Sequence, residues 1–162
     1  MGTQELFHLS TIKLLLTGIR PLNIFIIIAS IICALVKLDI IDLLQIISPI
    51  IIVSLIAIIG NLTNDLFDIE IDKINRPERI LAKYPEMKKY FMYLIFFCCF
   101  LLCAILPFVN YKSQIIVIIT LPAMLAYSYF LKGVPIMGNL LIAFYLGFVF
   151  SFTEIATMNE IN

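Results

Sequence analysis

Five long apolar runs constrain the fold of this chain more than any other feature. Each run approaches the roughly 20 residues that a helix needs to cross the hydrocarbon core of a bilayer. Because lipid cannot satisfy open backbone groups, and the runs lack the alternation of barrel strands, we expect transmembrane helices. The sequence predicts an all-α, polytopic helical bundle of about five spans in a single membrane domain. The runs lie at residues 22–38, 43–62, 91–109, 115–131 and 134–152 of the chain of 1–162.

The composition also predicts a membrane environment. Hydrophobic residues make up 62% of the chain and charged residues 14%, whereas soluble domains have roughly 45–50% apolar and about 25% charged residues. The chain is therefore predicted to be an integral membrane protein in contact with a lipid bilayer. The formal net charge is zero, so no overall field attracts nucleic acid.

The distribution of basic residues predicts the topology. With the N-terminus on the inside, only Lys37 and Lys112 of the eleven basic residues fall outside. The positive-inside rule then places the N-terminus and the acidic loop at residues 63–90 in the cytoplasm. Residues 1–20, which include Lys13 and an apolar stretch that follows it, are expected to lie on the membrane surface as a short amphipathic segment.

A cluster of acids and amides stands at the end of the second run. In a helix, where successive residues turn by about 100°, these side chains share one side. Three carboxylates so close repel one another unless a divalent ion or basic groups neutralise them, and Mg²⁺ is commonly shared between carboxylates and a substrate phosphate. The plain alternative is a solvated helix end, but carboxylates at a membrane segment normally mark function. We therefore predict a Mg²⁺-diphosphate site from Asn61, Asn64, Asp65, Asp68 and Asp72.

The same residues carry a resemblance to a known family. The stretch from Asn64 to Asp72 resembles the N-D-x-x-D-x-x-x-D motif of the UbiA superfamily of intramembrane prenyltransferases, and residues 72–77 resemble its D-K-x-N-R-P tail. Residues 20–23 are similar to the R-P-x-N opening of the family's first helix. Residues 127–132 are similar to the Y-S-x-x-L-K segment that ends its fourth helix. The resemblance covers nearly the whole chain.

The resemblance implies a fold of about nine transmembrane helices around a central cavity. It also implies transfer of a prenyl group from its diphosphate to a lipid or aromatic acceptor, with Mg²⁺ stabilising the leaving group. Among the branches, residues 67–77 look most like geranylgeranylglyceryl-phosphate geranylgeranyltransferases, followed by the 4-hydroxybenzoate and related quinone-pathway branches.

Carried over by position, the motif implies roles for its own residues. Asn64, Asp68 and Asp72 would hold a Mg²⁺ ion and the diphosphate, and Asp65 would belong to the same cluster. The catalytic group expected from the resemblance is therefore Asp65, Asp68 and Asp72.

Other matching positions imply substrate contacts. Lys73, Arg76 and Lys132 are candidates to contact diphosphate oxygens, although basic residues at these places also anchor a membrane protein. Asn23 and Tyr127 are candidates to line the cavity, although hydrogen bonding between helices would serve either residue as well.

The chain also departs from the family pattern. The family has a second aspartate-rich motif in a later loop, whereas no aspartate follows Asp72 here. We therefore expect the N-terminal part of a prenyltransferase, whose catalysis alone is doubtful. A gene fragment, a naturally short product and a half that pairs with a partner chain supplying the second motif all stay open. The alternative function is a non-catalytic membrane fragment or subunit.

Two other classes fit less well. CDP-alcohol phosphotransferases also place membrane aspartates on Mg²⁺, but their motif needs glycine after the aspartate, and Asp68 is followed by Ile69. A transport protein with an ion path would carry charges at mid-membrane depth, whereas these aspartates stand at the end of a run.

Overall fold

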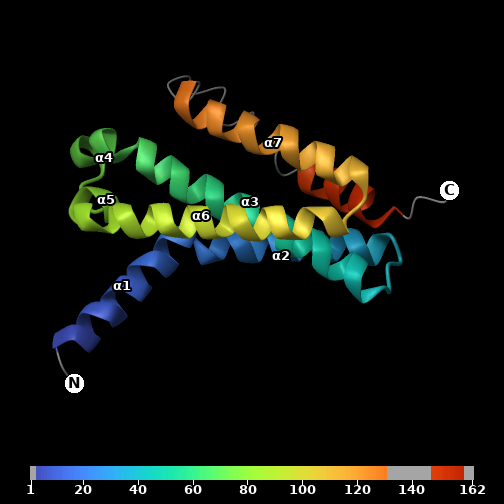
Figure 1. Ribbon diagram of the computed structural model, residues 1–162, viewed down its shortest axis with the longest axis horizontal. Coiled ribbons are helices and arrows are strands. Elements are labelled where there is room, and N and C mark those ends of the chain that lie inside the picture. The colour runs from blue at the N-terminus through green and yellow to red at the C-terminus, as the bar shows by residue number, and fades with distance from the viewer. Residues whose placement is uncertain (1–2, 131–146, 159–162) are drawn as a thin grey trace.

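The structure is a bundle of helices that run roughly along one direction, with the N-terminal helix leaving it at an angle (Figure 1). The computed structural model describes residues 3–130 and 147–158, with side chains from residue 11 onward except at positions 127, 128 and 130. Every regular element in these residues is helical, which confirms the predicted all-α membrane bundle. The elements are α1 (Thr3–Ile19), α2 (Pro21–Lys37), α3 (Leu43–Phe67), α4 (Ile69–Asn75), α5 (Ile80–Lys83), η1 (Pro85–Met87), α6 (Lys88–Ile105), η2 (Leu106–Phe108), α7 (Tyr111–Phe130) and a last helix over residues 147–157.

Several of these helices are long and apolar enough to cross a bilayer. Leu43–Phe67 and Pro85–Phe108 each pass this test alone. Thr11–Ile19 and Pro21–Lys37 pass it together as a pair bent by 43°. Tyr111–Ala126 is a shorter apolar helix. The described residues therefore contain two spans by length and composition, or three if the bent pair crosses as one.

Four of the five predicted runs coincide with α2, α3, α6 and α7. The fifth, residues 134–152, lies mostly outside the described residues. The count of five spans, and the surface position of residues 1–20, therefore stay predictions.

Helix α3 is the centre of the bundle. It contacts α1, α2, α6 and α7, and its buried residues include Ile52, Ile56 and Ile59, which recur at the three- and four-residue spacing of one helix face. The side chain of Asp42 accepts a hydrogen bond from the backbone N–H of Leu44 at 3.0 Å. This cap satisfies one of the open donors at the start of the helix.

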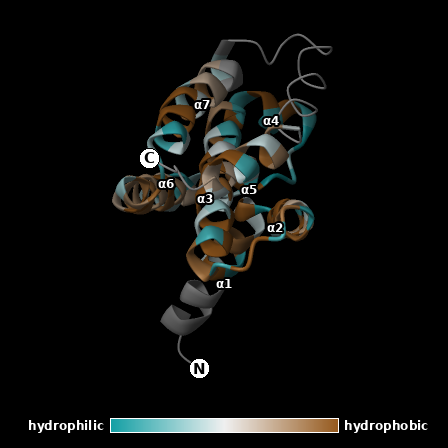
Figure 2. Cartoon of the chain, turned by 90° about the vertical axis from the view of Figure 1, so that its right-hand side faces the viewer, coloured by the Kyte–Doolittle hydropathy of each residue, from teal (hydrophilic) through white to brown (hydrophobic). Residues whose placement is uncertain are grey.

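The outer faces of the helices are also apolar, as Figure 2 shows. On α6, for example, the side chains of Phe96, Phe97 and Phe100 are all more than half exposed. In water such a surface would drive association, whereas in a bilayer it contacts hydrocarbon. The exposed aromatic face of α6 therefore suits a lipid environment.

The chain bends sharply between α1 and α2. Arg20 has φ 59° and ψ 68°, which is the left-handed region that residues other than glycine seldom adopt. Pro21 begins α2 and keeps the residue before it out of the right-handed helical region. The side-chain amide of Asn61 donates a hydrogen bond to the carbonyl of Ile19 at 3.1 Å. The bend therefore rests against α3 at the height of the aspartate motif.

The segment 63–90, which we expected to be a loop, is largely helical. Helix α3 continues to Phe67 and α4 starts two residues later. The backbone N–H of Asp68 donates to the carbonyl of Asn64 at 3.1 Å, and that of Asp72 donates to the carbonyl of Asp68 at 2.7 Å. Because this helical hydrogen bonding continues across the junction, the motif residues keep nearly the register of one helix.

Helix α4 ends where a proline follows. Arg76 precedes Pro77 and has φ −146° and ψ 64°, outside the helical region. The backbone N–H of Arg79 donates to the carbonyl of Arg76 at 3.0 Å, which closes a tight turn. This turn returns the chain towards α3 through α5.

A small apolar cluster supports this end of the bundle. Leu62, Leu81, Met87 and Phe91 are buried together, so that α5, η1 and α6 pack on the last turns of α3. A Cβ atom at Gly18 would lie 2.5 Å from the Cζ atom of Phe91, so the approach of α1 to α6 depends on glycine at this position. The cluster therefore holds the α1–α2 bend and α5 close to the aspartates.

Candidate functional site

Asp65, in the last turns of α3, joins two other segments through arginines. The Arg20 guanidinium, at the α1–α2 bend, donates a hydrogen bond from Nη2 to Asp65 Oδ1. The Arg79 guanidinium, just before α5, donates from Nη1 to the same oxygen at 3.0 Å. Only 14% of the Asp65 side chain is exposed. This carboxylate therefore connects three segments that are far apart in the sequence.

Asp68 and Asp72 are buried beside it, with 6% and 7% of their surfaces exposed. The Asn64 side-chain amide donates to Asp68 Oδ2 at 3.3 Å. Arg79 Nη1 lies 3.4 Å from Asp72 Oδ2, so this guanidinium bridges Asp65 and Asp72. The structure thus gathers three carboxylates and two arginines at one end of the bundle. Buried charges of this kind reduce stability unless they are well paired, so this cluster is the candidate site.

The other predicted contact residues lie elsewhere. Lys73 pairs with Glu70 at 2.8 Å, on a part of α4 where both side chains are largely exposed. Arg76 is exposed and forms no ion pair with any described residue. Asn23 is exposed on α2, and within the described residues its side chain makes no hydrogen bond to the aspartates. These three side chains are thus not part of the arginine–aspartate cluster.

Two predicted residues cannot be placed by their side chains. The side chain of Tyr127 and the whole of Lys132 lie outside the described residues. The neighbouring Tyr129 lies against Phe67 at the end of α3, with ring centroids 5.5 Å apart and an angle of 67° between the rings. The end of α7 therefore reaches the end of α3 that carries the aspartate motif.

The sequence patterns do not assign Arg20 and Arg79 to the site. Position 20 belongs to the segment 20–23 that resembles a family motif, and position 79 is one of eleven basic residues in the chain. Their roles depend on tertiary contacts, since Arg20 is separated from Asp65 by 45 residues and Arg79 by 14. A local pattern carries little information about such pairs.

The described residues contain no group of three or more histidine, cysteine, aspartate or glutamate side chains arranged to hold a metal ion. A Mg²⁺ ion often takes only one or two carboxylates from the protein and the rest of its ligands from water and substrate phosphates. Asp68 and Asp72, one helical turn apart and both buried, fit that share, and the amide oxygen of Asn64 is a third ligand of suitable chemistry.

Comparison with known proteins identifies the family. The model of the UbiA prenyltransferase family matches residues 23–161. A solved structure described as giving structural and mechanistic insights into the biosynthesis of digeranylgeranylglyceryl phosphate synthase in membranes superposes with a TM-score of 0.77 and 31% identity. The superposition covers 93% of this chain and 55% of that one.

Curated relatives agree with this match. The digeranylgeranylglyceryl phosphate synthase of Methanosarcina mazei is 38% identical over 105 residues, which are 62% of this chain and 35% of that protein. The synthase of the same name from Methanobrevibacter smithii is 32% identical over 155 residues, which are 88% of this chain and 51% of that protein. The chain thus spans about half the length of the relatives that it matches, or less. The family match over residues 23–161 confirms the resemblance seen in the aspartate motif: this chain belongs to the UbiA prenyltransferase family.

Proposed function

We propose that this chain provides the aspartate-rich diphosphate site of a membrane prenyltransferase. The reaction would move a geranylgeranyl group from its diphosphate to a glyceryl phosphate lipid acceptor. The observation that carries the proposal is the cluster of Asp65, Asp68 and Asp72 at one end of an apolar bundle, in which arginines pair with Asp65 and Asp72. The names of the relatives support the choice of donor and acceptor.

The residues of the cluster would have different roles in binding the diphosphate. Asp68 and Asp72, with the amide oxygen of Asn64, would hold a Mg²⁺ ion shared with the diphosphate. That ion, when bound, supplies Lewis-acid stabilisation of the leaving diphosphate. Asp65 already accepts hydrogen bonds from Arg20 and Arg79, so its role would be to position these arginines.

Arg79 would have the most direct part among the cations. Its guanidinium lies between Asp65 and Asp72, and a small movement from Asp72 would allow it to donate to a diphosphate oxygen. Guanidinium groups suit this task because their planar donors match phosphate oxygens. Lys73, Arg76, Lys132, Asn23 and Tyr127 stay predicted substrate contacts, and Lys73 would have to leave Glu70 to reach the site.

The orientation in the membrane is part of the proposal. The apolar helices and the family match support an integral membrane protein. Six of the eleven basic residues lie in the segment 63–90, and by the positive-inside rule this supports a cytoplasmic position for the end of the bundle that carries the aspartates.

The test is binding and transfer by the chain reconstituted in liposomes. We would measure Mg²⁺-dependent binding of radiolabelled geranylgeranyl diphosphate, and transfer of the label to geranylgeranylglyceryl phosphate. The Asp68→Asn, Asp72→Asn double variant should lose binding by about 100-fold or more, since it removes the charges that hold the ion.

Asp39→Asn is the matched control. Asp39 is outside the cluster and has φ 54°, a conformation that asparagine tolerates well. Its binding should equal that of the unchanged chain. Equal binding by the double variant and the unchanged chain would refute the site. Binding without transfer would support the alternative function, a membrane fragment or subunit that does not catalyse.

A further inference from the structure

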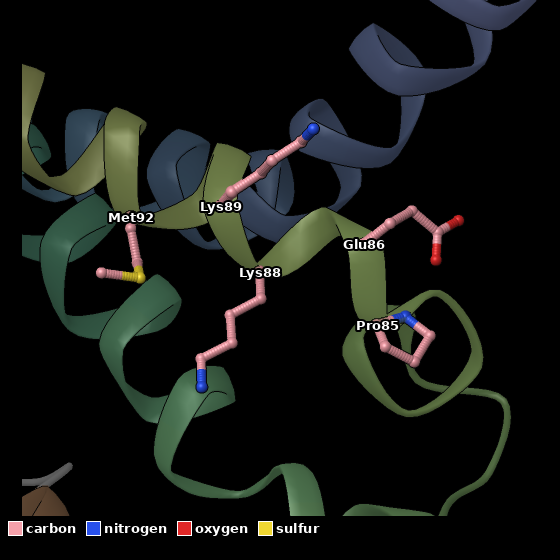
Figure 3. A pocket seen from close by; sticks show the side chains of 5 residues that line it. All are labelled: Pro85, Glu86, Lys88, Lys89 and Met92. Carbon is pink, nitrogen blue, oxygen red and sulfur yellow. The ribbon is translucent and has the colours of Figure 1, made fainter.

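A pocket of about 340 Å³ lies beside the first turn of α6, outside the arginine–aspartate cluster. Pro85, Glu86, Lys88, Lys89 and Met92 line it. Figure 3 shows Met92 on one side of this turn and Pro85 with Glu86 on the other, while the two lysines leave the helix in opposite directions. The proline ring, the lysine stems and the methionine give the pocket apolar walls, and the Lys89 ammonium lies 5.0 Å from the centre of the Tyr90 ring.

The charged residues around this pocket favour the binding of an anion. The start of a helix is the positive end of its dipole, where lysines are unfavourable and anions are favourable. Because η1 leads directly into α6, the helix that starts at Pro85 carries Glu86 as well as Lys88 and Lys89 near its start, and no side chain among the described residues caps it. Glu86 is the single acid of the lining, and in Figure 3 its carboxylate points away from Met92. The charged residues that line the pocket are therefore two lysines and one glutamate, and their net charge is positive.

The surface that continues from the pocket is apolar. Phe96 stands one turn along α6 from Met92, and Phe100 one turn further. Their exposed fractions are 68% and 69%, and that of Met92 is 41%. A free phosphate ion would use only an ammonium group, whereas a lipid would place its headgroup at one of the two lysines and its chains on this aromatic row. An amphiphile thus matches both parts of the surface.

We propose that this pocket binds the phosphate headgroup of an anionic membrane lipid, whose acyl chains lie along Met92, Phe96 and Phe100. The site is separate from the proposed diphosphate site, because none of Asp65, Asp68 and Asp72 lines the pocket. Basic residues near a membrane surface attract anionic lipids, by about five-fold in binding for each ammonium group. The pocket adds a defined place for one headgroup to this general attraction.

The absence of tryptophan from the chain allows a direct test. Phe96→Trp would place a single fluorescent reporter beside the pocket. We would reconstitute this variant in phosphatidylcholine vesicles that contain a low fraction of acyl-brominated phosphatidylglycerol or acyl-brominated phosphatidylcholine. Quenching by the brominated phosphatidylglycerol should reach its half-maximum at a several-fold lower fraction. Added Lys88→Gln and Lys89→Gln changes should abolish this preference, and high salt should weaken it.

Two controls separate a defined pocket from diffuse attraction. Lys13→Gln with Lys83→Gln removes the same charge from exposed residues outside the pocket and should keep the preference. A reporter from Tyr111→Trp, at the start of α7, should show none. The proposal falls if the Phe96→Trp reporter shows no preference, or if both lysine pairs lower it equally. It also falls if soluble glycerol phosphate displaces the brominated phosphatidylglycerol, since the pocket would then take a free phosphate.

Discussion

The two ends of the bundle are held together by different chemistry. At the end formed by α4 and α5, charged groups make the contacts, with Arg20 and Arg79 on Asp65. At the other end, where α6 passes into α7 (Figure 1), the contacts are neutral hydrogen bonds to the backbone. Since neutral bonds suffice to join helices, the charges of the first end need another explanation.

At the neutral end, a few hydrogen bonds hold α7 against the last helix. The Asn110 side chain accepts a hydrogen bond from the backbone N–H of Ser113 at 2.8 Å, and donates to the carbonyl of Ile155 at 2.7 Å. The Gln114 side-chain amide donates to the carbonyl of Val109 at 2.9 Å. One asparagine thereby links the start of α7 to the last helix, without any buried charge.

The charged end has a desolvation cost that the neutral end does not have. Moving carboxylates and guanidiniums out of water is unfavourable, and replacing such a group of charges by apolar residues often leaves stability unchanged or raises it. Asp72 lies in this environment with only 7% of its surface exposed. Neutral hydrogen bonds are thus enough for a helix junction, and the buried charges at the other end are consistent with the diphosphate site that we propose there.

Asp72→Asn tests the difference between the two ends most directly. We expect binding of geranylgeranyl diphosphate in Mg²⁺ to fall by about 100-fold, because a charged ligand of the ion is lost. The free energy of unfolding should change little, because loss of the ion pair with Arg79 is offset by weaker repulsion among the three carboxylates. Equilibrium binding and denaturant unfolding in mixed micelles would measure both quantities. A large loss of stability with unchanged binding would reverse the roles of the two ends.

Asp65→Ala should have the largest effect on stability. It removes the shared acceptor of Arg20 and Arg79 and leaves both guanidiniums without it. Both arginine side chains are about a third exposed or less, so water reduces the penalty, and we expect a loss of about 2 kcal/mol in the free energy of unfolding. Asp65→Asn, which keeps an oxygen acceptor, should lose less. Equal stability of the alanine variant and the unchanged chain would remove Asp65 from its positioning role.

Asn110→Ala tests the neutral end. It deletes the hydrogen bonds to Ile155 and Ser113, and the free energy of unfolding should fall by about 1 kcal/mol. Diphosphate binding should not change, because the residue lies at the other end of the bundle from the aspartates (Figure 1). A variant that unfolds normally but binds less diphosphate would show that the two ends are coupled.

Glu70→Gln should have the smallest effect. Glu70 lies within the acidic sequence but is 81% exposed and pairs only with Lys73 among the described residues. Exposed pairs at this spacing on a helix contribute about 0.3 kcal/mol, so thermal unfolding should barely shift. Diphosphate binding should stay at least as strong, since the change frees Lys73. Loss of binding as severe as that of Asp72→Asn would place Glu70 in the site.

Much of this molecule was predictable from local patterns. The apolar runs predicted the helical membrane fold, because both the length of a span and the need to close backbone hydrogen bonds are local requirements. The resemblance of residues 64–72 to a family motif predicted the family, which the match over residues 23–161 confirms. These inferences needed no knowledge of which helices touch.

The contacts of the site were not predictable in the same way. Arg20 reaches Asp65 because Pro21 forces a bend that rests on α3. Arg79 reaches it because Pro77 ends α4 and turns the chain back. The segment 63–90, expected as the cytoplasmic connection between two spans, contains short helices, and the helical register that grouped the aspartates continues through the motif. Tertiary geometry decides such contacts, and residue patterns record it weakly.

The left-handed backbone of Arg20 limits what mutation can do at this position. Glycine would relieve the backbone there, since it adopts positive φ readily, but it would leave Asp65 with one arginine fewer. Lysine would keep a positive charge, but it lacks the planar, forked donors of arginine and would keep the strained backbone. The residue best suited to the bend and the residue best suited to the carboxylate are therefore different amino acids, and arginine at position 20 favours the carboxylate.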